Sequence, residues 1–233
     1  MQSSQLTLYW SPLSQPSRAV HALLLIADIP FNTVVIDLSK GEQRTEDFKK
    51  INPRGVVPAI QDGDFTLGES TAILKYLCNT QPSIPGHYWP KNDDKRALVD
   101  QFLEYNGNHF RDSLHAPYMF YLIQKLRGVT FEAAEFESAM KACWKELDTL
   151  EVYLGQHEGD FIVGKEPTIA DIQIFSDFTS IYYNKIEEQF AENDKYPRIK
   201  AWKNKMLEII GVKKIFNQWH DKVLPNINGF MYS

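Results

Sequence analysis

Apolar residues along the chain form two kinds of stretch, short ones at the start and long ones with helical spacing later. Residues 6–9 and 33–37 are short, apolar or β-branched stretches, which predict strands. Residues 17–28 between them have apolar positions at helical intervals. A strand, a crossover helix and a second strand make a βαβ unit, so we expect these two strands to be parallel.

The next stretch continues the same small domain. Residues 40–50 are polar and predict a short helix, and Asp62-Gly63 between two short apolar runs is a hairpin signal. Residues 69–79 return to helical spacing. The order βαβαββα predicts a thioredoxin-like α/β domain, with a mixed four-stranded sheet and helices on both faces.

A proline-rich connector, residues 81–86, separates this part from one without further strand signals. We therefore predict a sheet domain over residues 1–83, a linker over 84–91 and an all-helical domain over 92–233. The helical intervals predict helices at residues 93–127, 131–156, 168–188, 197–208 and 212–223. Residues 224–233 contain Pro and Gly, and we expect either a tail lying over a pocket or a loose end.

Composition narrows the classes of function. The 233 residues are 43% apolar with a net charge of -5, which argues against binding to a nucleic-acid backbone. No apolar run approaches the ~18 residues of a membrane span, and no targeting signal is evident, so we expect a cytoplasmic protein. The two cysteines and six histidines show no ligand spacing. We expect no metal and no disulfide framework.

Two segments of the sheet domain carry candidate chemistry. Ser14 lies before Pro16 at a helix start, so its hydroxyl either caps the helix or donates to a thiolate near the positive helix N-terminus. Lowering a thiol pKa by ~2 units needs about 2.7 kcal/mol of preferential thiolate stabilisation. Val57-Pro58 precedes a strand, where a cis bond would leave the backbone of Val57 facing an extended peptide and a trans bond would simply open the strand.

Two further candidates have competing interpretations. Ser70 begins a predicted helix, whose N–H groups suit a carboxylate, and Glu69 beside it is placed to accept an ammonium group. A simple capping role is the alternative. Arg111 on the first long helix either reaches the cleft between the domains or forms a surface salt bridge.

Thr168 and Asp171 match a capping box before an apolar run. We assign this pair to folding, and we expect truncation of Asp171 to cost ~1 kcal/mol of stability.

The ordered motifs resemble one known family. Residues 6–30 with Ser14-Gln-Pro-Ser-Arg18, then Asn52-Pro-x-Gly-x-Val-Pro58, Glu69-Ser-x-Ala-Ile73 and residues 161–171 are similar to the theta class of cytosolic glutathione transferases. The resemblance spans most of the chain in colinear order. Each motif is weak alone, whereas the ordered set is specific.

The resemblance implies a role for each candidate residue. Ser14 would hydrogen-bond the glutathione sulfur, and Arg111 would lie near the sulfur and the leaving group. The implied glutathione-binding residues are Gln43, Arg44, Val57, Pro58, Glu69 and Ser70. Gln43-Arg44 replaces a His-Lys pair of many relatives, and Asn108 stands where an acid often reaches the partner subunit.

The implied activity is conjugation of the glutathione thiolate to small electrophiles such as alkyl halides, epoxides or activated alkenes. Glutathione is then the co-substrate, with no other cofactor, and the expected partners are a small hydrophobic electrophile and a second copy of the chain in a homodimer. The main alternative is a weak or inactive subunit that serves as a scaffold in a protein assembly.

Three rival activities also fit the sequence. A tyrosine-type transferase would use Tyr9, and a thiol-disulfide exchanger would use Cys78 or Cys143. A carrier would hold apolar ligands between the domains.

Overall fold

The computed structural model describes residues 6–232 of the chain. Four short strands form one sheet in the order β2-β1-β3-β4. They are β1 (Thr7–Trp10), β2 (Asn32–Val35), β3 (Ala59–Asp62) and β4 (Phe65–Gly68). β1 and β2 are parallel and the other neighbours antiparallel, which confirms the predicted βαβ unit and mixed sheet.

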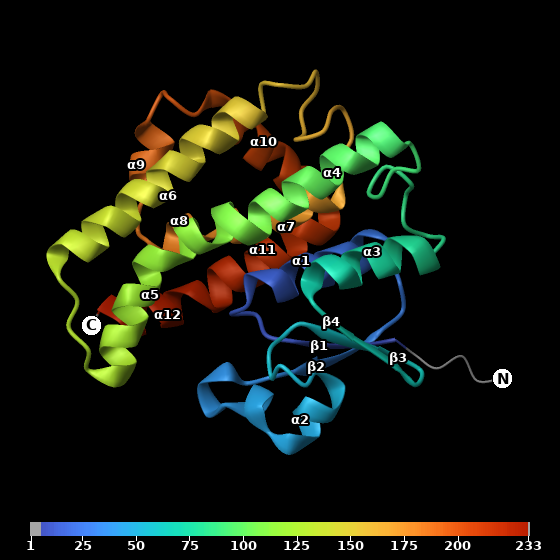
Figure 1. The fold of residues 1–233 in the computed structure, drawn as a ribbon, viewed down its shortest axis with the longest axis horizontal. Helices are drawn as coiled ribbons and strands as arrows, with labels where there is room; N and C mark the ends of the chain where they lie inside the picture. The colour runs from blue at the N-terminus through green and yellow to red at the C-terminus, as the bar shows by residue number, and fades with distance from the viewer. Residues whose placement is uncertain (1–5, 233) are drawn as a thin grey trace.

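Helices cover both faces of this sheet, as predicted. α1 (Gln15–Ile26) and α3 (Ser70–Thr80) lie on the face toward the helical domain, and α2 (Glu46–Ile51) lies on the opposite face (Figure 1). Two short 3-10 segments, Leu38–Lys40 and Glu42–Arg44, precede α2. α3 ends at Thr80 and α4 begins at Asp93, while the predicted boundaries at residues 83 and 92 stay a prediction.

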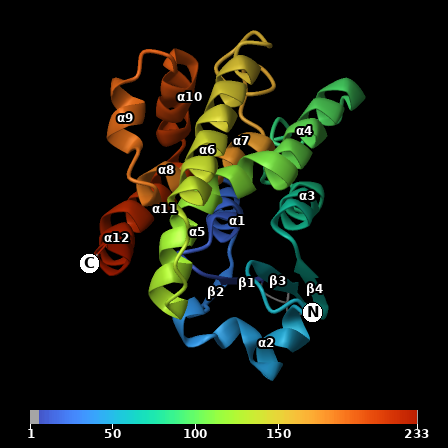
Figure 2. The same cartoon turned by 60° about the vertical axis from the view of Figure 1, so that its left-hand side comes forward.

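The second part of the chain is helical (Figure 2). Its helices are α4 (Asp93–Tyr105), α5 (Arg111–Arg127), α6 (Ala133–Tyr153), α7 (Ile169–Phe178), α8 (Ser180–Tyr183), α9 (Glu187–Glu192), α10 (Pro197–Glu208), α11 (Ile210–Lys222) and α12 (Leu224–Tyr232). None of the helices within residues 6–232 has the length and apolar character needed to cross a membrane.

Two predicted helices differ from those in the structure. The helix predicted over residues 93–127 contains a π-helical segment, Asn106–Phe110, between α4 and α5. The helix predicted over 168–188 is divided into α7, α8 and the start of α9. The first break falls at Thr179, and the second contains Lys185, which adopts a left-handed φ of 54°. The apolar pattern runs through these breaks because the residues on both sides of them are buried.

The C-terminal segment is a helix, so the expectation of a loose end was wrong, whereas the alternative of a tail lying over a pocket stays a prediction. α12 packs against α5, α8 and α11, and it buries Leu224 and Met231. Gly229 and Asn226 make this segment a weak helix former, and tertiary packing compensates for that low propensity.

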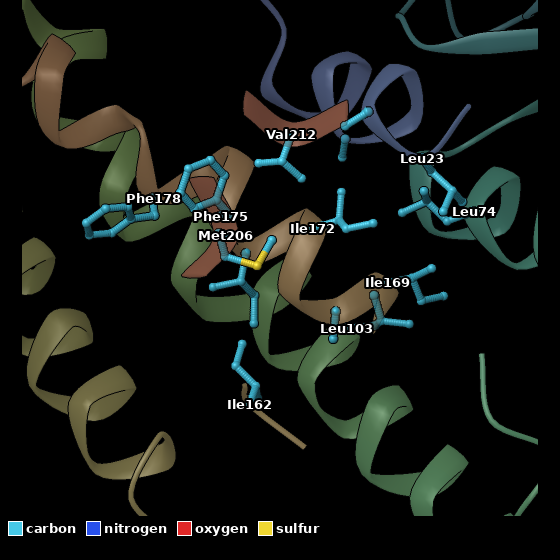
Figure 3. Close-up of a cluster of buried hydrophobic side chains, with 14 of the residues drawn as sticks. Leu23, Leu74, Leu103, Ile162, Ile169, Ile172, Phe175, Phe178, Met206 and Val212 are labelled. Carbon is cyan, nitrogen blue, oxygen red and sulfur yellow. The ribbon is translucent and has the colours of Figure 1, made fainter. Parts of the chain in front are cut away.

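α7 forms the centre of the core that joins the two parts. All ten of its residues are buried, which is typical of a helix enclosed on every side. Figure 3 shows Leu23 of α1 beside Leu74 of α3, with Ile169 and Ile172 of α7 next to them. The capping box predicted at Thr168 is confirmed, with the Thr168 N–H donating to Asp171 Oδ2 over 2.8 Å.

Candidate active site

The strand register gathers the candidate segments at one end of the sheet. Tyr9 lies opposite Ala59, Ala59 opposite Gly68, and Trp10 opposite Val35. The chain therefore leaves β1, β2 and β4, and enters β3, at this same end. Three candidate segments follow strands at this end, namely the Ser14 turn after β1, the 3-10 segments after β2 and the start of α3 after β4. The Val57-Pro58 bond precedes β3 at the same end.

Ser14 closes a tight turn and caps α1. Its N–H donates to Ser11 O over 3.0 Å, and its Oγ accepts from Ser17 N–H over 3.3 Å. The N-cap interpretation of Ser14 is therefore confirmed. It does not exclude the other role, because a hydroxyl oxygen that accepts one bond still has its hydrogen to donate. Ser14 is half-buried, and the positive end of the α1 dipole lies beside it.

The segment before β3 is held in shape by Asn52. The buried Asn52 side chain donates to Val56 O over 2.7 Å and accepts from Arg54 N–H over 3.2 Å. Gly55 adopts a φ of 63°, and a Cβ there would lie 2.9 Å from Gln43 O. This turn therefore packs directly on the backbone of the 3-10 segment.

The Val57-Pro58 bond is cis, one of the two forms that the sequence allows. Within residues 6–232, the backbone of Val57 makes no hydrogen bond to other backbone groups. Its N–H and C=O are thus unused at the end of the sheet, where an extended peptide would pair with them.

Glu69 and Ser70 form the start of α3. Glu69 has a φ of 62°, a conformation that costs a non-glycine residue of order 1–3 kcal/mol and is concentrated at functional sites. Its carboxylate does not cap α3 but pairs with the guanidinium of Arg54. The first N–H groups of α3 therefore lack a side-chain cap from Glu69, which suits them to an anionic ligand.

Gln173 on α7 supports this helix start. Its amide donates to Ser70 Oγ over 3.3 Å and to Thr71 Oγ1 over 3.0 Å. Ser70 is buried and Gln173 is 1% exposed, so these bonds connect the candidate site to the core of the helical domain.

Gln43 and Arg44 lie on the neighbouring 3-10 segment. Arg44 is exposed, which leaves its charge available to a ligand. Gln43 Oε1 is buried and has no hydrogen-bond partner among residues 6–232. A buried amide oxygen without a donor is costly, and a ligand N–H or a water would satisfy it.

The structure argues against the rival nucleophiles. The Tyr9 hydroxyl donates to Gln61 Oε1 over 3.0 Å, and Gln61 pairs with Thr7 at the other end of β1. Burial raises the pKa of the Cys78 thiol to about 12 and does the same for Cys143. Both thiols are therefore protonated at neutral pH.

Among residues 6–232, no group of three or more His, Cys, Asp or Glu is placed to hold a metal ion.

An aromatic cluster lies next to the Ser14 turn. Gln15 donates to Tyr118 OH over 3.3 Å and to Ser180 Oγ over 3.2 Å. Tyr118 in turn packs on Tyr183, with ring centroids 4.9 Å apart. The apolar cluster at this place contains Tyr118, Tyr182, Tyr183, Phe216, Trp219, Val223, Leu224 and Ile227. Its residues come from α5, α8, α11 and α12, and Gln15, the residue next to Ser14, bonds to α5 and α8.

Arg111 does not form the surface salt bridge considered above, because its partner is buried. Its Nε donates to Asp177 Oδ2 over 3.1 Å, and the Asp177 side chain is 1% exposed. Asn106 donates to the same oxygen over 2.8 Å, and His115 Nε2 lies 3.3 Å from Oδ1. Among the described residues, Arg111 Nη2 has no hydrogen-bond partner. Contact between Arg111 and a substrate stays a prediction.

Electrostatics at Asp177 favour the ionised form. Burial acts to raise the pKa of its carboxyl, but the Arg111 charge and the nearby His115 and Asn106 outweigh burial. The net result is a pKa below the ordinary value of 3.8. The carboxylate and guanidinium therefore form a charged pair at neutral pH.

Sequence reasoning missed four supporting residues, namely Gln15, Arg54, Gln173 and Asp177. The partners of Gln173 and Asp177 lie 62 to 103 positions away, so no local spacing indicates them. Gln15 does have a signal in the sequence, since it is a polar residue beside Ser14 at the start of a helix rich in apolar residues.

Comparison with known proteins identifies both parts of the chain. Residues 8–85 match the family model of the glutathione S-transferase N-terminal domain, and residues 114–218 match that of the C-terminal domain. Glutathione S-transferase T1 of Arabidopsis thaliana is 30% identical over 199 residues, which cover 85% of this chain and 81% of that relative.

Solved structures of human relatives share the fold. Glutathione-S-transferase T1-1 in its apo form has a TM-score of 0.83 and 26% identity, covering 97% of this chain and 96% of that one. Glutathione transferase theta-2, in complex with glutathione and an unknown ligand, has a TM-score of 0.82 and 28% identity. The match covers 96% of this chain and 89% of that one.

Proposed function

The chain belongs to the glutathione S-transferase family, and on that premise we propose that it conjugates glutathione to small apolar electrophiles through a thiolate stabilised by Ser14. The observation that carries the proposal is the strand register. It brings the Ser14 turn, the unused Val57 backbone and the start of α3 to one end of the sheet.

Each part of glutathione has a matching group there. The backbone N–H and C=O of Val57 pair with the cysteinyl unit, beside the cis bond to Pro58. Ser70 and the α3 N-terminus take the γ-glutamyl carboxylate, and Glu69 takes its ammonium group. Arg44, with Gln43 beside it, faces the glycyl carboxylate.

Ser14 acts on the sulfur without forming a covalent bond to it. Its hydroxyl hydrogen points at the sulfur while its oxygen keeps the bond from Ser17 N–H. The thiol proton leaves to solvent, and both the Ser14 hydrogen bond and the α1 dipole favour the thiolate that remains. The chain thus supplies orientation and charge stabilisation.

The electrophile sits against the aromatic cluster and Arg111. The sulfur electron pair forms a C–S bond, and the bond to the leaving atom breaks with its electron pair moving to that atom. Arg111 Nη2, which is buried and unpartnered among the described residues, is the group we assign to the developing negative charge.

A set of variants tests the role of Ser14. We expect Ser14→Ala to lower kcat/KM by at least about a hundredfold, and Tyr9→Phe to change it less than about threefold. Asn92→Ala is the matched control, because Asn92 caps α4 with a bond of 2.9 Å but lies outside the site. Loss of activity in Tyr9→Phe alone would contradict the assignment of Ser14.

We also propose a homodimer in which the sheet domain of one copy faces the helical domain of the other. Phe65 supports it, since this residue beside the β3-β4 turn is 46% exposed and packs on Tyr76. Light scattering should give twice the mass of one chain, and a monomer at micromolar concentration would contradict this proposal. The scaffold alternative predicts neither glutathione binding nor conjugation.

A further inference from the structure

Arg18, in the first turn of α1, is a buried cation without a carboxylate partner among the described residues. It is 2% exposed. The arginines of residues 6–232 that pair with carboxylates are Arg54, Arg111 and Arg198. Burying an unpaired charge is costly unless other groups compensate, so its contacts indicate what retains it there.

Those contacts lead from the Ser14 turn to the helical domain. Arg18 Nη1 donates to Pro12 O over 2.8 Å, inside the turn that Ser14 closes. Arg18 Nη2 donates to Thr179 Oγ1 over 2.8 Å and lies 3.5 Å from Ser176 O. The guanidinium also lies 4.5 Å from the ring centroid of Trp219 on α11.

We propose that Arg18 is a positioning residue of the site, which fixes the Pro12 to Ser14 turn against α7, α8 and α11 and adds a buried positive charge beside it. The planar fork of arginine suits this role, because it makes two directed bonds and stacks on an aromatic face at once. The inference rests on the proposed function, since the charge matters only to a thiolate bound at Ser14.

The surrounding groups leave this charge uncancelled. Tyr118 lies near the guanidinium, and burial raises the pKa of its hydroxyl well above the usual value, so it is neutral. Tyr183 joins the same cluster through its ring contact with Trp219. Asp177, which lies between Ser176 and Thr179 in the sequence, pairs with Arg111 instead of Arg18. In a buried setting a positive charge acts over a longer distance than it would in water.

Thiolate titration of bound glutathione tests the inference. Its ultraviolet absorbance is followed against pH for the wild type, Arg18→Met and Arg18→Lys, with kcat and the KM for glutathione measured in parallel. We expect Arg18→Met to raise the pKa of the bound thiol by at least one unit and to lower kcat about tenfold. KM should change less than about threefold, because the hydrogen bonds of Arg18 go to Pro12 and Thr179 and not to the residues proposed to bind glutathione. Arg18→Lys should give an intermediate pKa and kcat.

Arg96→Met is the matched control. Arg96 also donates to a proline carbonyl, Pro90 O over 2.7 Å, and also stacks on a tryptophan, with its guanidinium 5.3 Å from the Trp89 ring centroid. It lies on α4 away from the Ser14 turn, so its loss should lower stability but leave the thiol pKa unchanged.

The outcomes separate the two proposals. A wild type that binds no glutathione overturns the proposed function and this inference together. A wild type with a lowered thiol pKa, and a folded Arg18→Met variant with the same pKa and kcat, overturns the inference alone. If Arg18→Met does not fold, Arg18→Lys and Thr179→Val replace it. A thiol pKa and a kcat equal to those of the wild type in both variants would then overturn the inference.

Discussion

The two ends of α7 each hold a buried aspartate, and the two are stabilised in different ways. Asp171 accepts from neutral donors, namely Ile162 N–H, Thr168 N–H, Thr168 Oγ1 and Trp202 Nε1. Asp177 pairs with the charge of Arg111 and with Asn106. Burial raises the pKa of Asp171 in spite of its four bonds, whereas the pKa of Asp177 is lowered.

This difference indicates that Asp171 stabilises the fold, whereas Asp177 belongs to the candidate active site. All four hydrogen bonds of Asp171 are made within the chain, and they connect the loop before α7 to α10. Around Asp177, among the described residues, Arg111 Nη2 and Asn106 Oδ1 have no hydrogen-bond partner. Buried polar groups without partners are uncommon, and at this end of α7 they are available to a ligand or a water.

The largest expected effect on stability is at Asp171, near the start of α7. Asp171→Ala should cost about 4 kcal/mol of unfolding free energy, because it leaves four buried donors unpaired. This exceeds the ~1 kcal/mol expected from the capping box alone. Asp171→Asn keeps Oδ1 for Ile162 and Trp202 and should cost about half as much. Urea unfolding measures both, and a loss below about 1 kcal/mol for Asp171→Ala would contradict this account of the helix end.

At the other end, Arg111→Ala should cost about 2 kcal/mol of stability. It leaves the buried Asp177 charge short of a partner, and the figure is reduced because Arg111 is partly exposed and His115 remains. Conjugation should fall by a larger factor than any loss of glutathione affinity. Arg198→Ala is the control, since its pair with Glu151 is more exposed and should contribute below about 1 kcal/mol. Unchanged kcat in Arg111→Ala would remove Arg111 from the chemistry.

The acid dependence of stability should also differ between the two aspartates. A carboxyl with a lowered folded pKa contributes stability above its ordinary value of 3.8 and loses it as the pH falls through the folded value. Asp177→Asn should therefore flatten the acid limb of the unfolding free energy. For Asp171 the sign is opposite, because a raised folded pKa makes ionisation unfavourable as the pH rises. Unfolding of the wild type and Asp177→Asn at a series of acidic pH values tests the sign for Asp177. An acid limb in Asp177→Asn as steep as in the wild type would contradict the Asp177 assignment.

The smallest expected effect is at Gln173, between the two aspartates. Gln173→Leu removes the bonds to Ser70 and Thr71 and should weaken glutathione binding about fivefold, equivalent to about 1 kcal/mol. Gln218→Leu, on the exposed surface of α11, is the control. Equal affinities in the two variants would show that α7 does not support the start of α3.

Local signals explain what the sequence predicted. The sheet domain, the helical domain and the capping box all follow from spacings of a few residues. The sequence does not decide the isomer of the Val57-Pro58 bond, because the two forms differ by only ~0.5–1 kcal/mol before tertiary contacts act. Asp177 and Gln173 were missed because their partners lie in distant segments, and α12 was missed because packing rather than propensity stabilises it.

Calorimetric titration with glutathione, on the wild type and Ser70→Ala, tests the central claim most directly. We predict saturable binding to the wild type, weakened by Ser70→Ala because the carboxylate partner at the α3 N-terminus is lost. The absence of binding up to several millimolar glutathione in the wild type would contradict the claim and favour a scaffold role.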